Sequence, residues 1–381
     1  MEDIKYYIWL QRAFINNPEK AVKILEEFGS PKEFYRSKDK TRDYLTAEDN
    51  KNISACSVVS AEKAAESCRE KGIEIIPFDD SRYPEDFRNI PSPPFVIYAF
   101  GNLSLLEQKP IISVIGTRRC SEVGIKAAAH FSYDLTKAGA VICSGVANGI
   151  DASAIEGALM AGGNCIGIMA CSLDVNYPAN QRGLKRRLLE NSGLLLSEHA
   201  PTMKAYPSNF KPRNRLLSGV ASAVLAVEAP ETSGTNLTVT HAIEQGKEVF
   251  AVPQGPYVDT AAGTNAMIAE GIPAVFNATE LLRLLPSELL VNVDFSKIEE
   301  NSKAIFFPQY KTKIAFIIPE GLEENERKVL IALRDNGALN YDSIALKTGI
   351  DANILTSLLI SLELSGYTET DKAGKVSLKQ R

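Results

Sequence analysis

The sequence lacks the residue patterns that mark metal sites and disulfide frameworks. It contains six cysteines and three histidines in 381 residues, no two cysteines form a C-x-x-C pair, and the histidines cluster with none of them. Zinc sites and disulfide-rich domains both have recognisable cysteine spacings. We therefore expect no bound metal and no disulfide. Cys143 and Cys165 lie in apolar runs, where we expect them to be buried as small apolar side chains.

Long hydrophobic runs are also absent. No stretch is apolar over the length that a membrane-spanning helix needs. The first residues, MEDIKYYIWLQRAF, lack the basic start and the unbroken apolar core of a signal peptide. We expect a cytoplasmic protein with no membrane partner.

An excess of positive charge is missing as well. The net charge is −5, whereas nucleic-acid-binding domains often carry a strong positive excess. Any DNA-binding surface must therefore be local. A local patch of cations still attracts phosphate, because charges elsewhere on the surface are screened beyond about 10 Å at ordinary salt.

The chain has enough hydrophobic residues for large cores, distributed over regions of different pattern. These residues make up 45% of the sequence, and its length suggests about two to three domains, of which we expect three. Helical spacing predicts a small helical, SAM/HhH-like domain over residues 1–70, and closely spaced prolines predict a connector over 71–109. Residues 110–285 are expected to form the main domain, 286–318 a linker and 319–381 a winged-helix-like domain.

The main domain has a pattern typical of an α/β fold. Apolar, β-branched runs such as IISVIG, AVICSG and SAVLAVE alternate with amphipathic helical stretches. Near-continuous apolar strands separated by helices indicate a parallel sheet that is covered on both faces. We predict an extended Rossmann-like, doubly wound parallel sheet.

The last region contains three helical stretches and a polar hairpin. This order favours a winged helix, although any three-helix module with a tail would give the same pattern. The third stretch, ANILTSLLISLELSG, has no lysine or arginine, which favours a packing or partner-binding role over contact with duplex DNA. In the preceding linker, IAFII could form a short strand.

Small and polar residues follow the ends of the predicted strands. In open parallel sheets, ligands bind beyond the carboxyl ends of the strands, where helix N-termini attract anions. Residues 116–119 follow the first strand, and Arg118 there can hold a phosphate bidentately. In the loop 144–151, glycines allow close backbone approach and Asp151 could cap the next helix. The loop 230–236 is a third candidate for phosphate binding.

A basic stretch with interleaved aromatics, KAYPSNFKPRNR, covers residues 204–215. Cations that follow a backbone and exposed aromatic faces that stack bases are what single-stranded nucleic acid requires. Phe210 would then be a stacking platform. The alternative is that Phe210 anchors a core and that Arg213 and Arg215 pair with acidic neighbours.

Taken in order, these segments resemble the DprA/Smf (DNA-processing protein A) family. The matching text includes VIGTRR, SGVANGIDASAIEGAL, FKPRNRLLSGVASAVLAVEA and SGTNLTVTHAIEQGKEVFAVP. The resemblance implies a protein that binds single-stranded DNA in a basic pocket, forms a homodimer and loads RecA onto the DNA, with no catalytic activity and no cofactor. The residues that match the family's motifs, and that we expect to bind DNA, are Gly116, Thr117, Arg118, Ser144, Gly145, Gly149, Phe210, Arg213, Asn214, Arg215, Ser233 and Gly234.

The sequence departs from the family pattern in places. Ile155 stands where the family usually has a histidine, and Gln254 separates Pro253 from Gly255 where Pro-Gly is usual. A lysine that some members carry before the phenylalanine has no clear counterpart, since Lys204 and Lys211 both lie at other spacings. These departures bear on the detail of the pocket and not on the fold.

We expect a sequence-independent single-stranded-DNA-binding protein that protects incoming DNA and loads RecA during natural transformation and recombination. The main alternative is a nucleotide-binding or nucleotide-hydrolysing enzyme related to phosphoribohydrolases, but their paired glycines and following glutamate are missing from the loop 232–235. A dinucleotide-dependent oxidoreductase would need a G-x-G-x-x-G turn, which the sequence lacks. A protein-interaction scaffold that acts through the terminal domains is a third alternative.

Overall fold

The computed structural model describes residues 3–37, 45–298, 305–306, 318–319, 321–371 and 374–379. The chain divides into two compact units, Met1–Phe307 and Pro308–Arg381. In the described part of the chain, no single helix is both long and apolar enough to cross a membrane.

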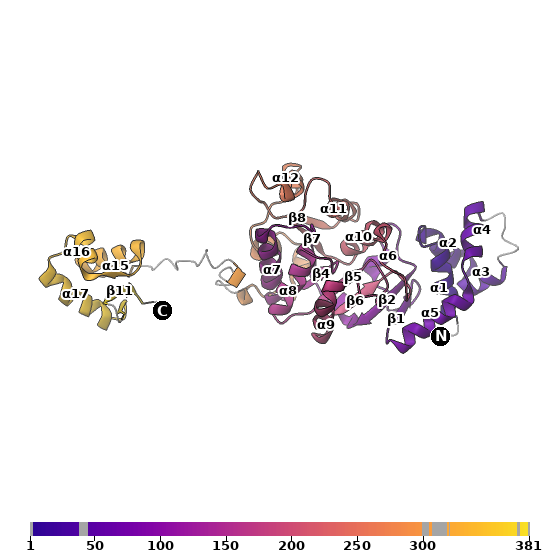
Figure 1. Cartoon of the computed structure of the whole chain (residues 1–381), viewed down its shortest axis with the longest axis horizontal. Helices are drawn as coiled ribbons and strands as arrows, with labels where there is room; N and C mark the ends of the chain where they lie inside the picture. The colour runs from indigo at the N-terminus through magenta and orange to yellow at the C-terminus, as the bar shows by residue number, and fades with distance from the viewer. Residues whose placement is uncertain are drawn as a thin grey trace. The chain divides into compact units, whose positions relative to one another are not determined.

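An eight-stranded sheet forms the centre of the first unit, with the order β1-β2-β6-β5-β4-β3-β7-β8 (Figure 1). Strands β3 to β8 pair in parallel, whereas β2 pairs antiparallel with both β1 and β6. The predicted doubly wound α/β fold is thereby confirmed, and the sheet is mostly but not entirely parallel. The strands are β1 (Glu74–Pro77), β2 (Val96–Gly101), β3 (Ile111–Gly116), β4 (Val141–Ser144), β5 (Cys165–Met169), β6 (Leu194–Ser197), β7 (Ala223–Glu228) and β8 (Glu248–Ala251).

Helices cover both faces of this sheet, as buried strands on both sides require. One face packs against α7, α8, α9 and α13, and the other against α6, α10, α11 and α12 (Figure 1). Cys143 and Cys165 are fully buried in these cores, as predicted, and all six cysteines are free. The helices are α6 (Glu85–Arg88), α7 (Glu122–Lys137), α8 (Ile150–Met160), α9 (Arg182–Glu190), α10 (Phe210–Gly219), α11 (Gly234–Glu244), α12 (Ala262–Ala269) and α13 (Ala278–Arg283).

The segment 71–109, predicted to be a connector, instead contributes β1 and β2 to the sheet. Its prolines are compatible with strands because of where they stand. Pro77 is the last residue of β1, and the other prolines of the segment all lie between β1 and β2. A proline at a strand end or in a loop removes no hydrogen bond from a central ladder.

Of the five N-terminal helices, α1 and α5 pack on the sheet, and α2, α3 and α4 pack around α1. Gln11 is almost fully buried, and its side-chain amide donates hydrogen bonds to the carbonyl oxygens of Val96 (2.7 Å) and Glu198 (3.0 Å). Tyr98 donates a hydrogen bond to the Gln11 Oε1 atom at 3.0 Å. The predicted helical domain therefore shares one compact unit with the sheet. Its helices are α1 (Ile4–Ala13), α2 (Pro18–Phe28), α3 (Pro31–Ser37), α4 (Ala47–Ala55) and α5 (Val58–Glu70).

The second unit is a small module of helices and a three-stranded antiparallel sheet in the order β10-β11-β9. Helices α16 and α17 together have the length and composition of a membrane span but bend by 110°, and both contribute to the core of this unit. The winged-helix assignment stays a prediction, and the strand predicted in IAFII falls, except for Ile318, outside the described residues. The elements are α15 (Glu324–Asn336), β9 (Leu339–Asn340), α16 (Tyr341–Thr348), α17 (Ala352–Leu364), β10 (Thr368–Thr370) and β11 (Lys375–Leu378).

Candidate functional site

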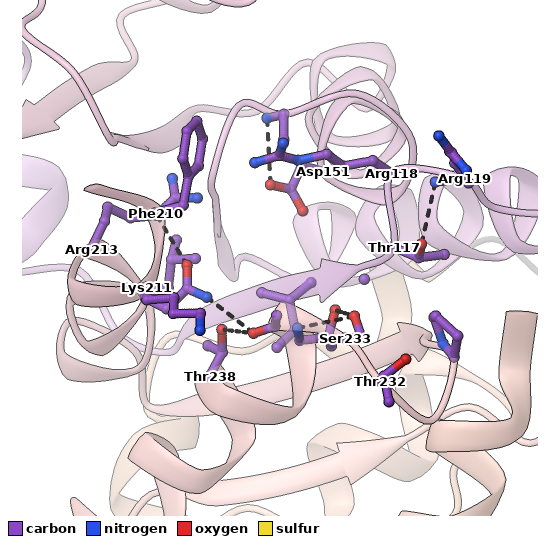
Figure 2. Close-up of a pocket in the computed structure, with 18 residues that line it drawn as sticks. Thr117, Arg118, Arg119, Asp151, Phe210, Lys211, Arg213, Thr232, Ser233 and Thr238 are labelled. Carbon is purple, nitrogen blue, oxygen red and sulfur yellow. Dashed lines mark hydrogen bonds between the residues drawn. The ribbon is translucent and has the colours of Figure 1, made fainter. Parts of the chain in front are cut away.

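A pocket lies where the strand order of the sheet reverses. From β3 the chain proceeds outward through β4, β5 and β6, and then returns to place β7 on the other side of β3. Ligands of open α/β sheets bind at such a switch point, beyond the carboxyl ends of the strands. The pocket there has a volume of about 390 Å³ (Figure 2). Its lining includes Gly116, Thr117, Arg118, Arg119, Asp151, Phe210, Lys211, Arg213, Asn214, Thr232, Ser233, Gly234, Thr235 and Thr238.

The loop after β3 is held by the buried carboxylate of Glu228 at the end of β7. Ser121 donates two hydrogen bonds to this carboxylate, from its backbone N–H (2.9 Å) and its hydroxyl (2.8 Å). At the other end of the loop, the Thr117 N–H donates to the Glu228 carbonyl oxygen at 2.7 Å. Glu228 therefore fixes both ends of the segment that presents Arg118 and Arg119.

Gln254, one of the departures from the family pattern, takes part in the same network. Its side-chain amide donates a hydrogen bond to the Glu228 Oε2 atom at 3.2 Å. A buried carboxylate needs hydrogen-bond donors when no cation accompanies it. Gln254 supplies one of these donors and lies outside the lining of the pocket.

Beneath the pocket, Arg213 and Asp151 form a buried charged pair on either side of a glycine. Arg213 is 5% exposed and Asp151 is 6% exposed. A Cβ atom on Gly145 would come within 2.6 Å of the Asp151 Oδ2 atom and 2.7 Å of the Arg213 Nη1 atom. Arg213 donates hydrogen bonds to the carbonyl oxygens of Gly145 (3.0 Å) and Ile168. Its guanidinium thus forms the floor of the pocket.

Burial acts on both charges of this pair. It raises the pKa of the Asp151 carboxyl, against the opposing effect of Arg213, and it lowers the pKa of the Arg213 guanidinium. Asp151 is not the predicted helix cap. The N-cap position of α8 is occupied by Gly149, so no side chain caps this helix. The Asp151 carboxylate instead accepts from the Ala147 N–H at 3.4 Å.

Three predicted site residues lie behind the pocket and do not line it. Ser144 is fully buried and donates its hydroxyl to the Val114 carbonyl oxygen at 2.7 Å. Gly145 makes room for the charged pair. Gly149 has a φ of 79°, and a Cβ atom there would lie 2.5 Å from the Thr117 carbonyl oxygen. These residues let two loops approach closely, so their place is structural.

Arg215 also lies outside the pocket, contrary to the sequence-based expectation. Its guanidinium makes two hydrogen bonds to the carboxylate of Glu198, at 2.6 and 3.0 Å, and one to the Ser92 carbonyl oxygen at 2.7 Å. Because this ion pair is buried, Arg215 has no free donor face for a ligand. It joins α10 to the end of β6.

Phe210 forms part of the pocket wall, and a guanidinium covers its ring. The ring is half-buried, and the Arg118 Cζ atom lies 4.4 Å from its centroid. Arg213 lies at 6.0 Å, and the Tyr177 ring packs at 5.8 Å between centroids. Phe210 belongs to neither of the two cores of the sheet, which disfavours the core-anchor alternative. In Figure 2 its ring stands at the rim, across the pocket from Ser233 and Thr232.

The opposite wall is the start of α11. The Ser233 hydroxyl accepts a hydrogen bond from the Thr235 N–H at 3.1 Å and so caps the helix. The Asn214 side chain donates to the Gly234 carbonyl oxygen at 3.0 Å, which links this wall to α10. A helix N-terminus with free N–H groups favours an anion.

Sequence reasoning did not select several lining residues, namely Arg119, Lys211, Thr232, Thr235 and Thr238. The signal was present for all of these except Thr238, since the other four lie within the stretches already chosen. Arg118, Arg119 and Lys211 are exposed, and none forms an ion pair in the part of the chain that the structure describes. Three exposed cations around an aromatic ring and a helix N-terminus suit a phosphate-bearing ligand. The described residues contain no cluster of metal ligands.

Comparison with known proteins identifies the family of this chain. The model of the family described as "DNA recombination-mediator protein A" matches residues 74–286. "DNA processing protein DprA" of Bacillus subtilis is 33% identical over 257 residues, which cover 68% of this chain and 85% of that protein. "Protein Smf" of Escherichia coli is 31% identical over 312 residues, 80% of this chain and 78% of that protein.

Two solved structures are similar to this chain. DprA from Streptococcus pneumoniae has a TM-score of 0.64 and 26% identity, and the match covers 74% of this chain and 98% of that chain. DprA from Helicobacter pylori, described for its single-stranded DNA binding mode, has a TM-score of 0.50 and 29% identity over 55% of this chain and 94% of that chain. The chain described here therefore belongs to the DNA recombination-mediator protein A family, the family of the DprA and Smf proteins.

Proposed function

We propose that this protein binds single-stranded DNA without sequence preference in the pocket between β3, β7 and α10. The observation that carries the proposal is the half-buried Phe210 ring surrounded by the unpaired cations Arg118, Arg119 and Lys211. A ring at the wall of a pocket can stack an unpaired base, whereas the bases of a duplex are already stacked on one another.

The absence of sequence preference follows from the kinds of group in the lining. Guanidinium and ammonium groups contact phosphates, and an aromatic face stacks with any base. The hydroxyls of Thr232 and Ser233 lie at the start of α11, where they suit phosphate oxygens. The relative from Helicobacter pylori, described as binding single-stranded DNA, supports the same ligand here.

We further propose that the protein acts in the cytoplasm as a homodimer that protects incoming single strands and loads RecA onto them in transformation and recombination. These roles rest on family membership. We assign no catalytic step to the pocket, and the buried Asp151 lies beside the Arg213 guanidinium. Sedimentation of the purified protein tests the dimer, and RecA assembly on coated single strands, with and without the protein, tests loading.

The binding proposal is tested by fluorescence anisotropy of a labelled oligonucleotide, single-stranded or in duplex, across a range of salt. The double variant Arg119→Ala/Lys211→Ala should weaken binding of the single strand and reduce its salt slope by about 1.4, or about 0.7 for each lost phosphate contact. Lys23→Ala/Lys63→Ala is the control, because it removes the same charge from exposed positions of α2 and α5. Preference for duplex DNA, or an equal effect of the two variants, would overturn the proposal.

A further inference from the structure

A second pocket lies between the N-terminal helices and the loop that follows β6. Its volume is about 490 Å³, and it is lined on one side by α1 and the start of α5, including Arg12 and Ser60. The other side is the segment 198–206, which includes Lys204 and Tyr206. The pocket exists because the N-terminal helices pack on the sheet through the buried Gln11 side chain.

The charge of this second pocket is positive. The Arg12 guanidinium donates to the Ser60 hydroxyl at 3.1 Å, and Lys204 is exposed. Neither side chain pairs with a carboxylate among the residues that the structure describes. Glu198 is the acidic residue of the lining, and Arg215 already neutralises it. Two cations are therefore available to an anion.

The second pocket also offers an aromatic face. The Tyr206 side chain is 50% exposed, and the neighbouring Met203 is 39% exposed. Large apolar side chains that stay in solvent at a cavity lined by cations form a surface on which a base can stack. The second pocket thus repeats the combination found at Phe210, in which an aromatic ring stands beside unpaired cations.

One short segment connects the two pockets. Tyr206 precedes the 3₁₀ turn η5 (Pro207–Asn209), and Phe210 is the first residue of α10. At a rise of about 2 Å per residue, the backbones of Tyr206 and Phe210 lie roughly 8 Å apart. A single strand whose binding site spans about 4–16 nucleotides reaches easily across that interval.

We propose that the single strand bound at Phe210 continues into the second pocket, where a base stacks on Tyr206 and Arg12 and Lys204 contact phosphates. This inference rests on the proposed function and extends it, because the N-terminal helices then form part of the DNA-binding surface. The strand runs along the segment 204–211, with cations on both sides of its path.

The experiment compares oligothymidylates of about 5 and about 20 nucleotides by anisotropy, since only the longer one spans both pockets. Arg12→Ala/Lys204→Ala should weaken binding of the long oligonucleotide roughly tenfold at low salt and reduce its salt slope by about 1.4. Tyr206→Ala should bind the long oligonucleotide about tenfold more weakly, with an unchanged salt slope. Binding of the short oligonucleotide at Phe210 should stay within about twofold of wild type.

The matched control is again Lys23→Ala/Lys63→Ala, and Lys204→Ala alone keeps the test valid if replacement of Arg12 lowers the melting temperature. If these variants bind the long oligonucleotide as tightly as wild type does, or lose affinity equally for both lengths, the proposed role of the second pocket is wrong. If the second pocket fails this test but Arg119→Ala/Lys211→Ala still weakens binding of the short oligonucleotide, the proposed function survives. If the wild type binds neither length, both proposals fall.

Discussion

Replacement of Arg118 by alanine removes two interactions that have opposite effects on DNA binding. The guanidinium is exposed at the pocket and available to a phosphate, so its loss weakens binding. The same guanidinium covers the Phe210 ring at 4.4 Å in the free protein. A base that stacks on that face must first displace it. A cation over an aromatic ring at an exposed site is worth about 0.5–1 kcal/mol, which corresponds to about two- to fivefold in affinity.

These two effects can be separated because only one of them depends strongly on salt. The lost phosphate contact reduces the salt slope by about 0.7, so its contribution shrinks as salt rises. Uncovering the ring changes affinity by a nearly constant factor. Arg119→Ala is the matched comparison, since Arg119 lines the same pocket and, in the described structure, is not among the cations over Phe210.

Anisotropy titrations of a single strand at several salt concentrations provide the assay. Both variants should bind more weakly than wild type at low salt and show the same reduced slope. At high salt, Arg118→Ala should bind about two- to fivefold more tightly than Arg119→Ala. An Arg118→Ala slope equal to that of wild type would refute the phosphate contact. Weaker binding than Arg119→Ala at every salt concentration would refute the displacement of the guanidinium.

Three further predictions concern the Phe210 ring, the loop 117–121 and the dependence of stability on pH. Phe210→Ala should cost about 1–3 kcal/mol of binding free energy in the same anisotropy assay, without a change in salt slope; a collapse of the melting temperature would show a core residue instead. Glu228→Gln should lower the free energy of unfolding in urea by about 1–3 kcal/mol and also weaken DNA binding, because its charge-assisted bonds hold the loop 117–121; unchanged stability and affinity would contradict this. Burial, together with the charge of Arg215, holds the pKa of His199 below its usual value, against the opposing effect of Glu198. His199 therefore stabilises the fold fully above about pH 6.5, and this contribution is lost as the pH falls through the lowered pKa. In urea unfolding at pH 7.5 and at pH 5, as approximate settings, His199→Asn should lose less stability on acidification than wild type, and an equal loss would contradict the effect.

The α/β fold of the first unit could be predicted because its parallel strands are continuous apolar runs. Exposed segments do not show this pattern. The loops that form the switch-point pocket could be selected because small polar residues follow the strands. The strand order then places the loops after β3 and β7 together. The strands β1 and β2 were missed because prolines fill the segment between them. The pairing of β2 with β6 depends on contacts between distant segments that local sequence does not encode.

The assignment of individual side chains was less predictable, for reasons of burial. Phe210, Arg213 and Arg215 lie within six positions of one another in the basic stretch, yet they face a pocket wall, a pocket floor and a buried carboxylate. A helix turns by about 100° per residue, so neighbours in sequence point in different directions. The partner of Arg215 is Glu198, 17 residues away, and only the folded structure brings them together.

The most direct test of the central claim is the affinity of the wild-type protein for a single strand relative to the same sequence in duplex, measured by anisotropy over a range of salt. The pocket described here predicts tighter binding of the single strand at every salt concentration, with a salt slope that Arg119→Ala/Lys211→Ala reduces and Lys23→Ala/Lys63→Ala leaves unchanged. Equal or tighter binding of the duplex, with a slope insensitive to the pocket cations, would contradict the account.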